Sequence, residues 1–158
     1  MLNLLFLCTG NSCRSIMAEA LLNHYGKGRF HAYSAGSFPT GEVHPTSLTT
    51  LGEKAIPTEG YYSKSWDELT TTHMDIVITV CDAAAGESCP IFPGKPLKGH
   101  WGVPDPAKYT GTETQTKAEF MRVCGMLEKR IQALLALPVE TMDRAKLQQA
   151  IMVIGEGI

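Results

Sequence analysis

The stretch at residues 2–15, LNLLFLCTGNSCRS, places two cysteines, a glycine and an arginine directly after a hydrophobic run. Its apolar residues are almost continuous rather than alternating, which is typical of a parallel strand covered on both faces. From Ser15 onward, apolar residues recur at helical spacing until Gly26 ends the pattern. The segment therefore predicts a buried strand at residues 2–7, a short loop and a helix.

The rest of the chain alternates short apolar runs with amphipathic helical patterns. Further strands are expected at residues 30–35, 75–80 and 97–101, and further helices at residues 45–52, 114–137 and 142–154. Residues 82–96 are small, Gly-rich and Pro-rich, and are expected to form a mobile loop. Strands that alternate with helices predict an α/β fold, a parallel sheet with helices on both faces.

Length and composition limit the function classes. The 158 residues, with a net charge of −2, fit one domain that buries about two-thirds of its unfolded surface. No Lys/Arg run stands out, so a nucleic-acid partner is not expected. The apolar start is too short for a signal peptide or a membrane span, and we expect a cytoplasmic protein with no membrane partner.

Five cysteines, an odd number, argue against a closed disulfide framework and are consistent with a reducing cytoplasm. The sequence has no CxxC pair and no closely spaced His/Cys quartet. Structural zinc is therefore not expected, and we predict no metal and no organic cofactor. Thiol chemistry remains open.

A cysteine and an arginine six positions apart occur twice, as Cys8 with Arg14 and as Cys124 with Arg130. The second pair lies in a predicted helix, where six residues span about 1.7 turns and leave the two side chains on different faces. Cys124 falls on the apolar stripe of that helix, so it is interpreted as a small buried hydrophobe. No chemistry is expected from the second pair.

Cys8 lies instead between a strand and a helix, where backbone N–H groups can converge on an anion. The field of the helix N-terminus is expected to lower the pKa of Cys8. Arg14 can bind two oxygens of an oxyanion, Gly10 and Asn11 tolerate the positive φ of a curled loop, and Ser15 can donate to the thiolate. The residues favour a nucleophile in a tetrahedral-oxyanion site over a plain turn.

Cys81 also follows a predicted strand, and ligands of parallel sheets bind beyond the carboxyl ends of the strands. Taken alone, Cys81 is equally well a core thiol and Cys89 an inert loop thiol. Asp105, within VPDP, is by itself best interpreted as a turn-initiating Asp-Pro. The residues alone leave these alternatives open.

Four more motifs follow CTGNSCRS in order: SAG at 34–36, VHPTSL at 43–48, VCDAAAGESCP at 80–90 and HWGVPDP at 100–106. With them, residues 2–137 resemble the arsenate reductases of the low-molecular-weight protein tyrosine phosphatase fold. The resemblance implies three layers, a four-stranded parallel sheet flanked by helices. It implies a catalytic domain at residues 1–137, and we expect residues 138–158 to be a helical extension packed on it.

The resemblance also implies a mechanism, reduction of arsenate to arsenite for arsenic detoxification. Cys8 attacks the arsenate that Arg14 helps to hold, and Asp105 protonates the leaving oxygen. Cys81 then attacks Cys8, and Cys89 attacks Cys81, in a disulfide relay. An external dithiol protein, thioredoxin or else glutaredoxin with glutathione, regenerates the thiols. Phosphate and sulfate are expected to compete as oxyanions.

The loop that the resemblance assigns to oxyanion binding consists of Thr9, Gly10, Asn11, Ser12, Cys13, Arg14 and Ser15. Asn11 is expected to support it through a side-chain hydrogen bond toward Ser34, and the Cys13 side chain is expected to be structural. Relatives with a potassium site carry an acidic residue where this chain has Lys64. The ammonium of Lys64 is expected to take the place of that cation, so no potassium dependence is predicted.

Two other functions stay open. The same anion loop serves a low-molecular-weight protein tyrosine phosphatase, which needs a nucleophile, an arginine and an acid but has no need of Cys81 and Cys89. A non-enzymatic redox sensor that binds an oxyanion would need no turnover at all.

Overall fold

Four parallel strands form one sheet in the computed structural model of the chain, which describes residues 1–86 and 90–157. The strands are β1 (Leu2–Leu7), β2 (Phe30–Ala35), β3 (Ile76–Thr79) and β4 (Leu97–His100), in the order β2-β1-β3-β4. All three strand pairs are parallel. This arrangement, with helices beside the sheet, confirms the predicted fold class.

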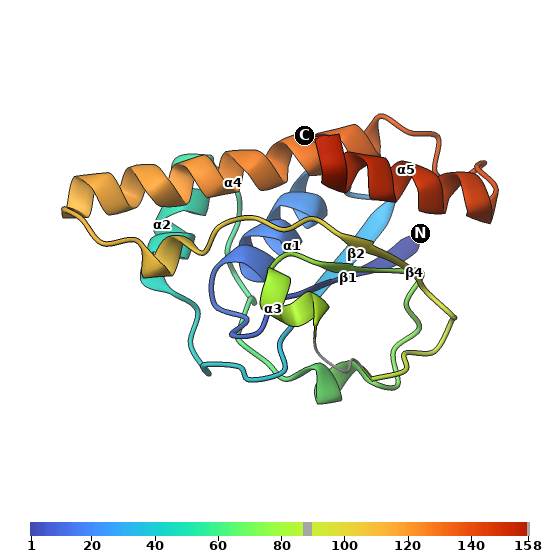
Figure 1. Ribbon diagram of the computed structural model, residues 1–158, viewed down its shortest axis with the longest axis horizontal. Helices are drawn as coiled ribbons and strands as arrows, with labels where there is room; N and C mark the ends of the chain where they lie inside the picture. The colour runs from blue at the N-terminus through green and yellow to red at the C-terminus, as the bar shows by residue number, and fades with distance from the viewer. Residues whose placement is uncertain (87–89, 158) are drawn as a thin grey trace.

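The helices are α1 (Arg14–Tyr25), α2 (Pro45–Glu53), α3 (Asp82–Ala85), α4 (Glu113–Leu135) and α5 (Arg144–Gly157), with 3₁₀ turns η1 (Trp66–Leu69) and η2 (Pro106–Lys108). Figure 1 shows α4 and α5 side by side along one side of the molecule, and α3 near the carboxyl ends of the strands. No helix in the described part of the chain is both long enough and apolar enough to cross a membrane.

The C-terminal helix α5 covers β4, the strand at one edge of the sheet. The Gln148 side chain accepts a hydrogen bond from the Lys98 N–H (3.2 Å) and donates one to the Lys98 carbonyl (2.6 Å). Trp101 Nε1 donates to the Ile151 carbonyl at 3.0 Å, and Ile151 occupies the space left by Gly99. An uncovered edge strand invites pairing with other chains, so α5 protects this edge.

Helix α3 departs from the sequence-based expectation, because it stands at the start of the segment predicted to be a loop. The Cys81 sulfur accepts a hydrogen bond from the Ala84 N–H at 3.4 Å and so caps the helix. A thiol is not among the usual capping groups, which are Ser, Thr, Asp and Asn. The start of α3 therefore carries no ordinary capping signal in the sequence.

Candidate active site

The loop between β1 and α1 turns its carbonyl groups outward. Three carbonyl oxygens are each held from outside by a backbone N–H group at 3.0 Å: Thr9 by Phe38, Gly10 by Thr40, and Ser12 by His44. In a trans peptide the N–H of the next residue points the opposite way, so the N–H groups of residues 10, 11 and 13 face the inside of the loop. One of them, the Gly10 N–H, acts on the Cys8 thiol in the direction that lowers its pKa. N–H groups that converge in this way are the kind of arrangement that can hold an anion.

The glycine of the SAG motif lets β2 approach this loop. A Cβ atom on Gly36 would lie 2.3 Å from the Thr9 carbonyl oxygen and 2.5 Å from that of Cys8. Real Cβ atoms essentially never come under 3.0 Å, so no other residue fits without moving the nucleophile. The backbone of Gly36 is fixed in turn by the Lys64 carbonyl, which accepts its N–H at 3.0 Å.

Asn11 holds the loop from within. Its backbone has a φ of 45°, in the left-handed region, and its side chain is fully buried. Its Nδ2 donates to Ser15 Oγ at 2.8 Å and to Ser34 Oγ at 3.0 Å, while its Oδ1 accepts from the Lys64 N–H at 2.8 Å. The contact with Ser34 is the one expected from the sequence, and it ties the loop to β2.

A buried pair of opposite charges lies behind Asn11. Lys64 Nζ donates to the Ser34 carbonyl at 3.0 Å, and Ser34 Oγ donates to Glu19 Oε1 at 2.6 Å. Burial raises the pKa of Glu19 to about 7, although the positive charge of Lys64 opposes that rise. Burial also lowers the pKa of Lys64. A cationic side chain therefore sits beside the supports of the anion loop.

Arg14, the first residue of α1, reaches across the loop to the segment that carries Asp105. Its Nη1 donates to the Val103 carbonyl at 3.2 Å, and its Nη2 lies 3.4 Å from Asp105 Oδ2. Its Nε is buried and has no hydrogen-bond partner in the part of the chain that the structure describes. A buried donor without a partner is costly, and an oxyanion in the loop would satisfy it.

Asp105 is placed by its own local structure. Its Oδ1 accepts the Ala107 N–H at 3.0 Å, which caps the turn η2, and Pro residues flank it on both sides. Its side chain is 22% exposed, so the carboxyl group can exchange protons with solvent. The structure thus brings Asp105 and Arg14 together, as a general acid beside an oxyanion site requires.

Cys8 and Cys81 are neighbours at the ends of β1 and β3, and both are buried. Hydrogen bonding with Cys81 raises the pKa of Cys8, and burial adds to the rise. Hydrogen bonding with Cys8 is the main cause that lowers the pKa of Cys81 to about 5, against the effect of burial. Arg14 lowers the pKa of both thiols. The two thiols therefore titrate as a coupled pair, in which the pKa of Cys81 is the lowered one.

The prediction that the pKa of Cys8 is lowered is wrong for this arrangement. The field of the helix terminus is outweighed by hydrogen bonding with Cys81 and by the burial of Cys8. The lowered pKa lies at Cys81 instead. Thr9 contributes to this placement through its backbone N–H and through its hydroxyl, 3.8 Å from the Cys81 sulfur.

Cys13 and Cys89 are the two other cysteines that the sequence places near this site. Cys13 is buried at the start of α1, beside the Ser12 hydroxyl (3.6 Å), and burial raises the pKa of its thiol. Its backbone belongs to the anion loop, whereas its side chain packs in the core. Cys89 lies outside the described residues.

Sequence reasoning assigned no role to Arg130, yet the structure connects it to this site. Cys124 is fully buried in the core, as expected. Arg130, on the same helix α4, is 6% exposed, and its Nη1 donates to the Gly102 carbonyl at 3.0 Å. Gly102 lies three residues before Asp105. Helical periodicity could not reveal this contact, because its partner is in a distant loop.

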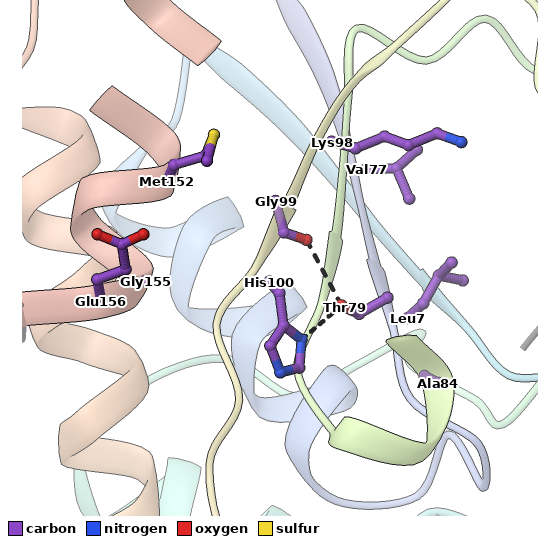
Figure 2. A pocket seen from close by; sticks show the side chains of 10 residues that line it. All are labelled: Leu7, Val77, Thr79, Ala84, Lys98, Gly99, His100, Met152, Gly155 and Glu156. Carbon is purple, nitrogen blue, oxygen red and sulfur yellow. Dashed lines mark hydrogen bonds between the residues drawn. The ribbon is translucent and has the colours of Figure 1, made fainter. Parts of the chain in front are cut away.

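A cavity of about 650 Å³ lies beside β3 and β4 rather than at the anion loop. Figure 2 shows Thr79, His100 and Ala84 on its lining, and neither Cys8 nor Arg14 is among the lining residues. Within residues 1–86 and 90–157, no three His, Cys, Asp or Glu side chains are grouped to hold a metal ion. The anion loop itself brings together thiols, Arg14 and Asp105.

Comparison with known proteins agrees with this geometry. The family model for low molecular weight phosphotyrosine protein phosphatases matches residues 3–149. The chain belongs to this phosphatase family. Within the family, its sequence and fold are similar to those of arsenate reductases.

The arsenate reductase of Halalkalibacterium halodurans is 40% identical over 126 residues, which are 80% of this chain and 89% of that protein. A solved structure of an arsenate reductase in the phosphate binding state superposes with a TM-score of 0.72 at 28% identity, and covers 86% of this chain and 98% of the other. A thioredoxin-dependent arsenate reductase of Corynebacterium glutamicum has a TM-score of 0.57 at 30% identity; the match covers 84% of this chain and 62% of that one.

Proposed function

We propose that this chain reduces arsenate to arsenite through a Cys8–Cys81–Cys89 disulfide relay. The observation that carries the proposal is the contact between Cys81 and Cys8 beside Arg14. A phosphatase of this family needs one nucleophilic thiol, whereas a reductase needs a second thiol as well, because two thiols together give up two electrons when they form a disulfide. The similarity to arsenate reductases supports the same choice.

The first step uses the shared proton of the two thiols. Cys8 passes its proton to Cys81 and attacks arsenic as a thiolate, while Arg14 and the loop N–H groups hold the remaining oxygens. Asp105 protonates the oxygen that leaves, which departs as water. The product is a Cys8 sulfur–arsenic(V) adduct.

The second step moves the electrons. Cys81 loses its proton again, which the N–H groups of Thr9 and Ala84 favour, and its thiolate attacks the Cys8 sulfur. The sulfur–arsenic bond breaks, and its electron pair stays on arsenic, which leaves as arsenite. Cys89 then attacks Cys81, frees Cys8 and forms a Cys81–Cys89 disulfide. The balance is one arsenate and two thiols converted to arsenite, one disulfide and water.

We propose thioredoxin as the dithiol that reduces this disulfide, with glutaredoxin and glutathione as the second choice. One similar protein is described as thioredoxin-dependent, which supports the first choice. A cytoplasmic location fits, because Cys8, Cys13, Cys81 and Cys124 are all free thiols and the relay needs them reduced. Phosphate and sulfate should compete for the anion loop; a solved arsenate reductase similar to this chain is described in a phosphate binding state.

The decisive experiment measures arsenite formed with thioredoxin, thioredoxin reductase and NADPH, and in parallel with glutaredoxin and glutathione. Cys8→Ser, Cys81→Ser and Cys89→Ser should each abolish turnover. Cys124→Ala, a buried cysteine remote from the relay, is the matched control and should turn over normally. A Cys89→Ser protein that cycles at the wild-type rate would remove Cys89 from the mechanism.

The same proteins separate the competing functions. Aryl phosphate hydrolysis that survives Cys81→Ser, and that far exceeds arsenate turnover in the wild type, would favour the phosphatase. Arsenate binding without any turnover would favour the redox sensor.

A further inference from the structure

We propose that Arg130 is a positioning residue for the general acid, because it holds the Gly102 carbonyl and thereby sets the segment that carries Asp105. The inference rests on the proposed function, in which Asp105 protonates the leaving oxygen. It starts from one geometric fact: Arg130 Nη1, on α4, donates to the Gly102 carbonyl at 3.0 Å.

The peptide unit between Gly102 and Val103 is held at both ends. Its carbonyl oxygen accepts from Arg130, and its N–H donates to the Val80 carbonyl at 3.1 Å. Because a peptide unit is planar, fixing both its oxygen and its N–H fixes the orientation of the whole plane. Without Arg130, the bond to Val80 is the one that remains among the described residues, and the plane can rotate about it.

The next peptide unit is held by Arg14, whose Nη1 donates to the Val103 carbonyl at 3.2 Å. Pro104 follows, and its ring fixes φ, so little freedom remains between Val103 and Asp105. The two arginines thus fix adjacent carbonyls of one segment, Arg14 from the anion loop and Arg130 from α4. The orientation set at Gly102 is transmitted to the carboxyl group of Asp105.

Arg130 is a buried cation, and burying a charge is costly unless hydrogen bonds stabilise it. The residue is 6% exposed, and burial lowers the pKa of its guanidinium. A buried cation of this kind is stabilised by hydrogen bonds to carbonyl oxygens. Arginine suits the task better than lysine because its planar fork is rigid and orients what it binds.

The test is the rate of arsenite formation in a single turnover, with pre-reduced protein and no recycling system. Arg130→Met keeps the length of the side chain but removes the donors, and should slow this step about tenfold with little change in arsenate affinity. Asp105→Asn should slow it about a hundredfold or more. The double variant should be no slower than Asp105→Asn alone, because the acid that Arg130 positions is already absent.

Arg130→Lys should be faster than Arg130→Met but slower than the wild type. If Arg130→Met does not fold, the same single-turnover rate is measured in Arg130→Lys and compared with the wild type. Cys124→Ala, on the same helix, controls for loss of packing and should react at the wild-type rate. An unchanged rate in Arg130→Met, or losses that multiply in the double variant, would overturn the role of Arg130 while the wild type still forms arsenite. A wild type that forms no arsenite would overturn the proposed function, and this inference with it.

Discussion

Cys8 and Cys81 lie at the ends of neighbouring parallel strands, and hydrogen bonding with Cys8 is the main cause that lowers the pKa of Cys81, to about 5. The Cys81 thiol, whose ordinary pKa is 9.0, should therefore ionise as the pH rises through about 5, and be a thiolate at neutral pH. Cys8→Ala removes this hydrogen bonding, so the pKa of Cys81 should rise. The ultraviolet absorbance of the thiolate, followed against pH, measures the shift.

Cys13→Ala is the control for this titration, because the pKa of Cys13 is raised and its removal should leave the thiolate signal in place. Thr9→Val should produce a smaller rise in the pKa of Cys81, since it removes the hydroxyl at 3.8 Å but keeps the backbone N–H. A Cys81 titration that is unchanged in Cys8→Ala would show that the two thiols do not titrate as a coupled pair.

Asp105 has a structural task and a chemical one, and two substitutions separate them. Its carboxylate caps η2 through the Ala107 N–H, a contact that Asn keeps and Ala loses. Asp105→Asn should keep the melting temperature near that of the wild type and slow arsenite formation about a hundredfold or more. Asp105→Ala should lose a similar factor in rate and also about 1 kcal/mol of stability. An Asn variant as active as the wild type would remove Asp105 as the acid.

The fold could be predicted because its two central strands have a clear sequence pattern. The apolar run of β1 and the β-branched run of β3 lack the polar alternation of a half-exposed strand, and each is followed by a cysteine. Parallel strands place those cysteines at the same edge of the sheet. The relation between Cys8 and Cys81 thus follows from the sequence once the sheet is parallel.

Other features depend on long-range contacts that a sequence does not display. Helix α3 is capped by the sulfur of Cys81. The proposed role of Arg130 depends on its contact with the Gly102 carbonyl, which lies in a distant loop. The ionisation of the Cys8–Cys81 pair was misjudged because the helix terminus was weighed without the partner thiol. Local sequence patterns identify helices and strands. The pKa values of two neighbouring thiols depend on the contact between them, which a sequence does not show.

Lys64 places a positive charge beside the supports of the anion loop, and we expect it to take the place of the potassium ion that some relatives bind. Its Nζ donates to the Ser34 carbonyl at 3.0 Å and lies 4.4 Å from the centre of the Tyr62 ring. Because this cation is part of the chain, potassium chloride should raise neither activity nor melting temperature beyond the effect of equal sodium chloride. Lys64→Met should lower the melting temperature in both salts. A rise specific to potassium in the wild type would contradict this prediction.

Glu19 should make the stability of the protein depend on pH near neutrality. Burial raises its folded-state pKa from 4.5 to about 7, so its contribution to stability is present below pH 4.5 and is lost as the pH rises through 7. The loss is on the order of 3 kcal/mol for a shift of this size. Glu19→Gln keeps an acceptor for the Ser34 hydroxyl and cannot ionise. The free energy of unfolding, measured in urea from pH 5 to pH 8, should fall more steeply in the wild type than in Glu19→Gln, and parallel curves would show that Glu19 does not titrate in this range.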